Sequence, residues 1–371
     1  MTPIPACAGK WKGSIFTIKL LHSADWHLGT PFTGKKAADS LAEALLSIPH
    51  RIAEICRREQ CQILLLSGDL FDGSVTKETL RVFRQALEEI SIPVFIAPGN
   101  HDFAAAGSLW LTELWPENVH IFTKSTVTSV VLPDLDCRVY GAGFEAMDCP
   151  GLLEGFHAQH PERYSIGIFH GDPTQVNSPY CPITPRQIRN CGLSYLALGH
   201  IHKGGQLQAG ATLCAWPGCP MGRGFDEQGE KGVLLVTLEQ EASAKFISLG
   251  LPRFFEASLD VCEDAVSALE AALPAAGNED FYRIILTGTS DPLDIHSLMN
   301  HFSRFPNLEL RDRTQPPTDL WRSAGEDNLE GVFFQLLQES MTEQSEKDRR
   351  ITLLAAQIAR QILDGQEVSL P

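Results

Sequence analysis

Short apolar runs alternate with helical patterns over the first two-thirds of the chain. Runs rich in β-branched residues predict buried strands at Ile15–Leu21, Ile63–Ser67, Val94–Ala97, Ser165–Phe169 and Tyr195–Leu198. Apolar positions at helical spacing predict helices at about Ala38–Glu59 and Lys77–Glu89. A β-rich stretch follows from Gly210 to Leu249, with a strand at Val233–Leu238. This rhythm predicts an α/β domain with a mostly buried sheet.

The pattern changes at Leu251-Pro252. Shorter strands are then predicted at Phe254–Leu259, Tyr282–Thr287 and Leu308–Asp312, with helices near Ala265–Leu273 and Asp294–Phe302. Gln315-Pro316-Pro317 breaks the chain, and two amphipathic helices follow at about Asn328–Glu339 and Glu346–Asp364, the second ended by Gly365. We therefore expect three parts: an α/β domain at 14–252, a small α+β domain at 253–318 and a helical segment at 322–371.

Composition is that of a globular protein, with 371 residues, 43% hydrophobic and 20% charged. No apolar run approaches the ~20 residues that span a bilayer. The first residues lack a basic stretch followed by an apolar one, so we expect a cytoplasmic protein without membrane contact. The ten cysteines form no CxxC pair and are expected to be reduced.

The net charge of −16 is unevenly distributed. From Phe254 onward there are 21 acidic and 9 basic residues, which leaves 25 acidic and 21 basic residues before it. This balance weakens an argument for broad nonspecific DNA binding. It still allows a local phosphate-binding cleft, because bound metal ions would add positive charge that the sequence does not count.

Five polar motifs each follow a predicted strand: Asp25-Trp26-His27, Gly68-Asp69, Gly99-Asn100-His101-Asp102, His170 and Gly199-His200-Ile201-His202. Ligands gather at the carboxyl ends of strands in α/β sheets. Carboxylate, imidazole and amide oxygen suit Mn²⁺, Fe²⁺ or Zn²⁺. Any one motif alone is common, since Gly-Asp often marks a turn and a single histidine often packs in a core. The five together, in this order, predict a metal site.

The set resembles the calcineurin-like metallophosphoesterase superfamily and, within it, the bacterial SbcD- and YhaO-type DNA repair exonucleases. Similar residues extend beyond the motifs, at Leu21–Gly29, Gly68–Asp72, Trp115–Phe122 and from Trp216-Pro217-Gly218 to Gly232-Val233. The resemblance covers nearly the whole chain from about Phe16 and is weakest in the acidic C-terminal third. It implies central β-sheets flanked by helices, a small α+β capping domain and a C-terminal helical pair.

The resemblance also implies two divalent metal ions, with Mn²⁺ expected. One ion would be bound by Asp25, His27 and His202, the other by Asn100, His170 and His200, and Asp69 would bridge them. Two cations about 3.5–4 Å apart can clamp the attacking and leaving oxygens of an in-line displacement.

His101 is next to a predicted ligand but is not itself assigned to a metal. By the resemblance it is the general acid, or the group that orients the phosphate, for the leaving oxygen. Asp72 or Asp102 could hold its ring, and the sequence does not choose between them. Helix capping is the alternative for both acids.

The resemblance implies a DNA phosphodiesterase, a 3′→5′ exonuclease with single-strand endonuclease activity that acts in DNA repair. The metal core does not select the substrate, so a small-molecule or cyclic-nucleotide phosphodiesterase or phosphatase is the alternative. A non-catalytic scaffold is a third hypothesis, which the intact ligand set disfavours. Candidate substrate contacts are Arg223 and Lys203 for phosphate, and Phe103, Trp110 and Tyr180 for stacking on unpaired bases; packing in the core or on the surface explains each equally well.

Partners are implied by the same resemblance. The small domain fits the capping domain that such nucleases place beside the active-site cleft. The terminal helices resemble the segment with which the family docks onto a coiled-coil, SMC-like ATPase, although packing onto the phosphoesterase domain is an equal alternative. A homodimer is implied as well, without a sequence feature that supports it.

Overall fold

The computed structural model describes residues 17–72, 75–159, 162–261, 264–315, 319–342 and 344–365. The predicted domain start at residue 14, the first residues of the strand predicted at Ile15–Leu21, and Pro316-Pro317 lie outside these ranges. The chain divides into two compact units. One comprises Met1–Ala257, Ala276–Ile284 and Phe302–Glu309, and the other comprises Ser258–Ala275, Ile285–His301 and Leu310–Pro371. The three predicted domain ranges stay predictions.

The first sheet has six strands in the order β12-β11-β1-β2-β3-β4. Its parallel strands are β1 (Ile18–Ser23), β2 (Ile63–Leu66), β3 (Val94–Ile96) and β4 (Val119–Ile121). An antiparallel hairpin extends this sheet beside β1, formed by β11 (Gly232–Leu238) and β12 (Ala242–Ser248).

The second sheet also has six strands, in the order β5-β6-β7-β8-β10-β9. Its parallel strands are β6 (Cys137–Gly141), β7 (Tyr164–His170), β8 (Tyr195–Gly199) and β10 (Thr212–Trp216). The antiparallel edge strands are β5 (Thr128–Leu132), which a 3-10 turn at Pro133–Leu135 joins to β6, and β9 (Gly205–Ala209).

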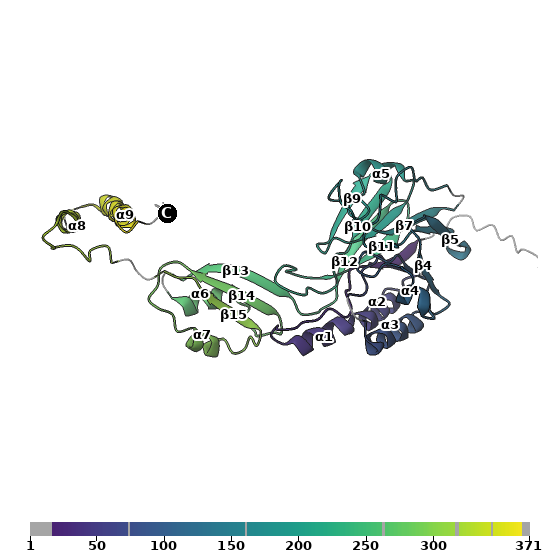
Figure 1. Ribbon diagram of the computed structural model, residues 1–371, viewed down its shortest axis with the longest axis horizontal. Coiled ribbons are helices and arrows are strands. Elements are labelled where there is room, and N and C mark those ends of the chain that lie inside the picture. Colours follow the sequence, from purple (N-terminus) through teal and green to yellow (C-terminus); the bar gives the residue numbers. More distant parts are fainter. Residues whose placement is uncertain are drawn as a thin grey trace, which may run out of the picture. The chain divides into compact units, whose positions relative to one another are not determined.

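Helices cover the outer faces of this pair of sheets, as Figure 1 shows. The first sheet is covered by α1 (Ala38–Leu46), α2 (Ile48–Arg58) and α3 (Lys77–Glu89); the short α4 (Leu109–Thr112) follows β3, and α5 (Pro185–Asn190) packs on the second sheet. Leu20 and Leu65 face the core between the sheets, whereas their neighbours Leu21 and Leu64 face the helices. Both strand faces are therefore buried, which explains the continuous apolar runs and confirms the predicted α/β sandwich.

The single helix predicted at Ala38–Glu59 is wrong, because the structure has two. The first ends at Leu46, and Pro49 lies in the first turn of the second. Proline has no backbone N–H and cannot continue the hydrogen-bond ladder of a preceding helix, but it is tolerated in a first turn. The hairpin of β5 and β6 was not predicted, since β5 is mostly exposed and β6, although largely buried, is a five-residue strand interrupted by Arg138.

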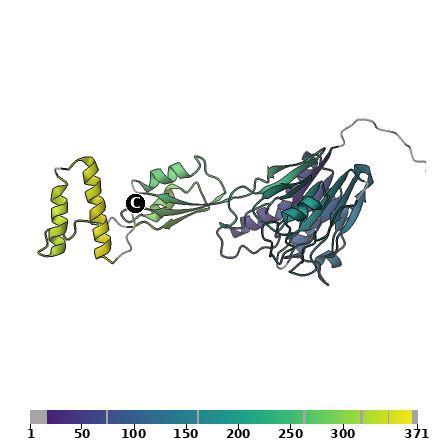
Figure 2. The same ribbon diagram turned by 90° about the horizontal axis from the view of Figure 1, so that it is seen from above.

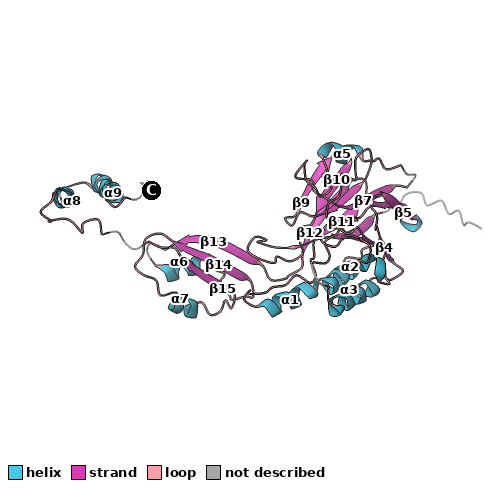
Figure 3. Cartoon of the chain, in the orientation of Figure 1, coloured by secondary structure: helices cyan, strands magenta, loops and turns pink. Residues whose placement is uncertain are grey.

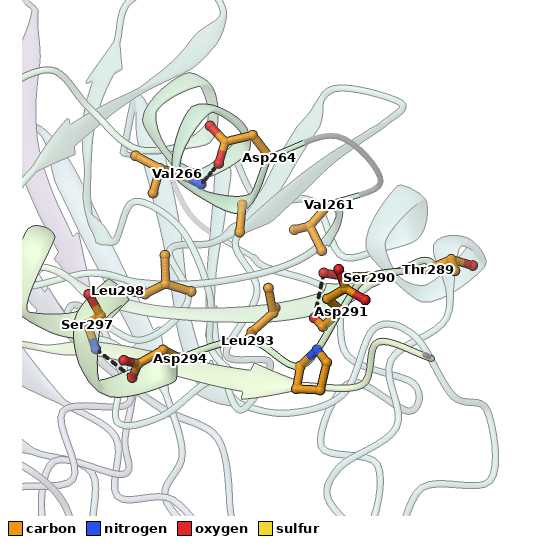
Figure 4. Close-up of a pocket in the computed structure, with 12 residues that line it drawn as sticks. Val261, Asp264, Val266, Thr289, Ser290, Asp291, Leu293, Asp294, Ser297 and Leu298 are labelled. Atoms are coloured by element: carbon orange, nitrogen blue, oxygen red, sulfur yellow. Dashed lines mark hydrogen bonds between the residues drawn. The ribbon is translucent and has the colours of Figure 1, made fainter. Parts of the chain in front are cut away.

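The C-terminal region contains a three-stranded sheet in the order β13-β14-β15, shown in magenta in Figure 3. Its elements are β13 (Phe254–Asp260), α6 (Ala265–Ala272), β14 (Phe281–Thr287), α7 (Ile295–His301) and β15 (Leu308–Asp312). A cavity of about 510 Å³ lies by α6 and α7 (Figure 4). Two of its acids, Asp264 and Asp294, accept hydrogen bonds from backbone amides in the first turns of these helices.

The last two helices are α8 (Leu329–Ser340) and α9 (Glu346–Leu363), which lie side by side in Figure 2. Arg360 is only 2% exposed; it donates to Glu330, and its guanidinium lies 4.0 Å from the ring centroid of Phe334. This part-buried ion pair joins the two helices. Among the described residues, no helix is both long enough and apolar enough to cross a membrane.

Candidate metal centre

The predicted metal ligands meet at one edge of the sandwich. Asp25 and His27 follow β1, Asp69 follows β2, and Asn100 follows β3, all in the first sheet. His170 is the last residue of β7, and His200 and His202 follow β8, both in the second sheet. Because these strands run parallel within each sheet, their carboxyl ends bring all seven side chains together.

Four of these residues adopt left-handed backbone conformations that non-glycine residues seldom adopt. The φ angles are 55° for Asp25, 50° for His27, 51° for Asp69 and 92° for His200. Such conformations cost about 1–3 kcal/mol each and persist where the surroundings impose them. At Asp25 and His27, hydrogen bonds between the loops hold the conformation, since the Asp25 amide donates to the Gly68 carbonyl and the His27 amide to the Asp69 carbonyl, both at 3.0 Å.

One cluster consists of Asp25, His27 and His202, whose potential ligand atoms lie within 4.8 Å of one another. Nε2 of His27 lies 3.1 Å from Nε2 of His202, so at most one proton can lie between them. Oδ2 of Asp25 is buried and has no hydrogen-bond partner among the described residues. The Nε2 atoms of the two histidines and the unpaired Oδ2 of Asp25 therefore point to one place. A bound cation would supply the partner that these buried atoms lack.

A second cluster consists of Asp69, His170 and His200, together with the Asn100 amide. Nδ1 of His170 lies 2.9 Å from the Ser67 carbonyl and donates to it, which turns Nε2 towards the cluster. That Nε2 lies 2.9 Å from Oδ1 of Asn100 and 3.4 Å from Oδ2 of Asp69, both of which are acceptors. The lone pairs of His170 Nε2, Asn100 Oδ1 and Asp69 Oδ2 would repel one another at these distances. A proton or a metal ion between them removes this repulsion.

Asp69 is the carboxylate that the two clusters share. Its Oδ2 lies 4.0 Å from Nε2 of His27 in the first cluster and 3.4 Å from Nε2 of His170 in the second. Its Oδ1 accepts from the His101 amide at 2.9 Å, and the residue is 1% exposed. This position is the one that a bridging ligand requires.

The charges of the site also favour cations. Burial raises the pKa of Asp25 to about 6, because a carboxylate removed from water prefers its neutral form. Burial opposes ionisation at Asp69 too, but the charges of His170 and His27 hold the pKa of that carboxyl below its usual range. Burial lowers the pKa of His170, yet Asp69 and Asp25 outweigh it and raise the pKa to about 9. The raised pKa values of Asp25 and His170 favour protonated forms whose protons a bound metal ion would displace, whereas Asp69 stays ionised.

His101 lies at the mouth of the site, with its side chain 44% exposed. Its Nδ1 is 3.2 Å from Oδ1 of Asp72, and its ring centroid is 4.8 Å from that of His27. Of the two acids that sequence analysis left open, the structure therefore places Asp72 at the His101 ring.

Asp102 has a different position. Its buried carboxylate accepts from the amides of Gly99 and Leu70, each at 2.8 Å, and of Asp69 at 3.2 Å. It thereby ties the loop after β3 to the loop after β2. The alternative of helix capping is wrong for both acids, since Thr76 is the N-cap of α3 and Ser108 that of α4.

Glu227 is a site residue that sequence analysis missed. It is 7% exposed, and its Oε1 lies 2.6 Å from Nδ1 of His202. At this distance Nδ1 carries the proton and donates to the carboxylate, which leaves the Nε2 lone pair for a metal ion. Arg223, a predicted phosphate contact, donates from Nη2 to the same Oε1 at 2.7 Å and lies 3.8 Å from Asp72. Glu227 lies in a loop and had no pattern that could have identified it.

The candidates for base stacking differ in accessibility. Trp110 is 3% exposed, packs against Phe71 and Phe83, and donates its Nε1 to the Asp102 carbonyl, so its proposed contact with bases is wrong. Phe103 is partly buried against the outer core of the second sheet. Tyr180 is partly exposed, with its ring centroid 4.8 Å from that of His200.

A sandwich of two sheets with carboxylate, imidazole and amide ligands at one edge defines a metallophosphoesterase. Residues 18–204 match the family model of the calcineurin-like phosphoesterases, and the chain belongs to this family of dimetal hydrolases. The chain is 29% identical over 300 residues to the uncharacterized metallophosphoesterase YhaO of Bacillus subtilis, covering 74% of this chain and 72% of YhaO.

Two further similarities are shorter or more distant. The SbcD subunit of the nuclease SbcCD from Staphylococcus saprophyticus is 31% identical over 121 residues, which is 31% of each chain. A dimetal phosphatase from Danio rerio aligns at 13% identity with a TM-score of 0.39, over 63% of this chain and 99% of the phosphatase.

Proposed function

We propose that the chain is a metal-dependent DNA phosphodiesterase of DNA repair, a 3′→5′ exonuclease with single-strand endonuclease activity. The observation that carries the chemistry is a pair of ligand clusters sharing Asp69, with His101 exposed beside them. The substrate class rests on the similarity to a relative named as part of a nuclease. The runner-up is a small-molecule or cyclic-nucleotide phosphodiesterase or phosphatase that uses the same site.

The proposed ligands follow the two clusters. Asp25, His27 and His202 hold one ion, Asn100, His170 and His200 hold the other, and Asp69 contacts both. When bound, two divalent ions, with Mn²⁺ expected, supply Lewis-acid polarisation of the phosphodiester. The chain's own part is to hold these side chains rigidly at the ends of buried strands.

His101 is the proposed general acid. Its Nδ1 is engaged by Asp72 at 3.2 Å, so Nε2 is the nitrogen left to carry a proton to the leaving oxygen. Asp72 fixes the orientation of the ring. Proton transfer of this kind contributes about 10²–10⁴-fold to the rate.

The exposed face of α8 is the proposed docking surface for a coiled-coil, SMC-like ATPase. Leu329 is 88% exposed, Val332 49%, Phe333 41% and Leu336 61%, and their spacing puts them on one helix face. The staphylococcal relative is named as one part of a complex, SbcCD, which supports a partner for this chain. Leu336→Asp should abolish co-purification with the ATPase but leave hydrolysis by the isolated chain intact. Homodimerisation and a cytoplasmic location stay predictions.

The test of the nuclease proposal is cleavage of end-labelled double-stranded and single-stranded DNA with Mn²⁺. The parent should cleave both, whereas His101→Ala should lose about 10²–10⁴-fold in turnover. Elemental analysis should find two metal ions in both proteins. A parent that hydrolyses bis-p-nitrophenyl phosphate but leaves DNA intact would support the small-molecule alternative, and parental turnover by His101→Ala would exclude the general-acid role.

A further inference from the structure

A pocket of about 500 Å³ lies beside the candidate metal centre, within the first unit. The residues that line it include Lys203, Lys231, Trp216 and Phe246. Glu230 is the acid that lines it. Neither the proposed metal ligands nor His101 contribute to this wall, so the pocket is a separate feature of the molecule.

Strand register places the pocket at the same edge of the sandwich as the metal ligands. In the first sheet, His22 at the end of β1 pairs with Leu234 near the start of β11, so Lys231 lies at the end of β1 that leads to Asp25. In the second sheet, Trp216 ends β10, which runs parallel to β8, the strand that leads to His200. The pocket therefore opens where the carboxyl ends of both sheets meet.

Hydrogen bonds join the pocket wall to a metal-ligand loop. Lys203 directly follows His202, and the Trp216 indole N–H donates to the Lys203 carbonyl at 3.1 Å. Nζ of Lys231 donates to the His202 carbonyl at 3.4 Å. The indole also lies so close to Gly205 that a Cβ there would be 2.6 Å from its ring, which only glycine avoids. A substrate in this pocket would be positioned by the same loop that positions His202.

The chemistry of the wall fits a nucleotide unit. Two lysines against one glutamate make it locally positive, although the chain has a net charge of −16. Phe246 is 43% exposed, and it lies in a pocket that also presents an indole. Aromatic rings beside lysines are the combination with which proteins bind single strands, since bases stack on the rings and phosphates contact the ammonium groups.

We infer that this pocket binds the nucleotide next to the scissile phosphodiester, with its base on Trp216 and Phe246 and its phosphate at Lys203 and Lys231. The inference rests on the proposed nuclease function and extends it to a subsite that selects polynucleotides over small diesters. A compact diester such as bis-p-nitrophenyl phosphate has no second nucleotide to fill the pocket.

The experiment compares Phe246→Ala, Lys203→Gln and Lys231→Gln with the parent. Lys245→Gln is the matched control, because Lys245 precedes Phe246 on β12 and strand side chains alternate between faces, so it is not in the pocket wall. Binding of a fluorescein-labelled single-stranded oligonucleotide is followed by anisotropy at several salt concentrations. The kcat/KM is measured with Mn²⁺ for the same oligonucleotide and for bis-p-nitrophenyl phosphate.

We expect Phe246→Ala to lower the ratio of oligonucleotide to small-diester kcat/KM about 5- to 160-fold, the range for loss of one stacked base. Each lysine variant should weaken binding and make the dependence of log K on log salt shallower by about 0.7. Lys245→Gln should match the parent in every measurement.

Each other outcome decides a separate point. A parent that cleaves the oligonucleotide, with pocket variants that bind and cleave as it does, would overturn the subsite alone. Equal losses on both substrates would also overturn it, since the wall would then serve only to hold the metal loop. Pocket-dependent binding without cleavage would refute the nuclease proposal and overturn a subsite beside a scissile bond, although the pocket would then still bind single strands. A parent that neither binds nor cleaves would overturn both.

Discussion

Glu227→Gln tests whether the carboxylate behind His202 controls metal binding. The substitution keeps the size of the side chain but removes its charge. Glu227 is ionised at neutral pH: burial opposes this, but hydrogen bonds from His202 and Arg223 hold its pKa below the usual range. The Nδ1–H of His202 would then lose the carboxylate that it meets at 2.6 Å.

The expected magnitude follows from this contact. Removing a hydrogen-bonded partner of a metal-binding histidine lowers metal affinity about 10- to 100-fold, which is about 1.4–2.7 kcal/mol. Because Arg223 is close by, we expect the loss of metal affinity to be near the upper end of this range. Nη2 of Arg223 lies 3.1 Å from Nδ1 of His202, and without Glu227 only Asp72, 3.8 Å from the guanidinium, would offset its positive charge.

The assay is isothermal titration of the chelator-treated protein with Mn²⁺, with thermal unfolding measured in parallel. Glu162→Gln is the control, because Glu162 forms a comparable ion pair with Arg138 at 2.7 Å outside the metal centre. We expect Glu227→Gln to weaken one of two Mn²⁺ sites and Glu162→Gln to weaken neither. Parental Mn²⁺ affinity in Glu227→Gln, with only a lower unfolding temperature, would refute the reasoning and assign Glu227 a purely structural role.

Three further perturbations address the rest of the site. Asp69→Ala should lose metal because both clusters share its carboxylate, and two tightly bound ions by elemental analysis would contradict that role. Gly99→Ala would drive a Cβ into Oδ1 of Asp69, so we expect loss of metal and about 1–3 kcal/mol of unfolding free energy in denaturant melts; unchanged values would show that the loop can shift. Burial lowers the pKa of His22 from 6.5 to about 3, so over this range the unfolded chain binds a proton that the native chain does not. Stability should therefore decrease as the pH is lowered through this range, with His22 contributing up to about 1.4 kcal/mol per unit. In denaturant melts with chelator, His22→Gln should make the pH dependence of stability shallower by that contribution, while Asp69, Glu227 and His200 keep theirs. A variant as pH-dependent as the parent would show that His22 does not contribute.

The sequence allowed the strand ends to be predicted well, because buried parallel strands are continuous apolar runs and their ends are marked by polar motifs. It could not show that β1 to β3 belong to one sheet and β7 and β8 to another. That division depends on long-range packing, in which Leu20 and Ile166 share one core. The helix break near Pro49 was missed for the opposite reason, since apolar spacing continued through it.

Residues that act through geometry were harder to predict than those in motifs. The sequence does not distinguish the roles of Asp72 and Asp102. In the structure Asp102 accepts hydrogen bonds from three backbone amides, whereas Asp72 contacts the His101 ring. The position of Trp110 in the sequence, close to the third motif, does not distinguish a side chain that stacks on bases from one that fills the core. The structure buries it. Glu227 follows His202 by 25 residues, and its contact with that histidine arises only when two loops fold together.

The left-handed conformations of Asp25, Asp69 and His200 lower the stability of the fold at positions where the metal ions require these side chains. Glycine adopts φ angles near 50–90° at little cost, so replacing any of these residues by glycine would relieve strain in the metal-free chain. A library selected only for heat resistance in the presence of chelator would therefore enrich substitutions at the very positions that hold the ions. Consensus or stability-guided engineering of this protein must therefore hold these residues constant, because selection for thermal stability alone would remove the metal ligands.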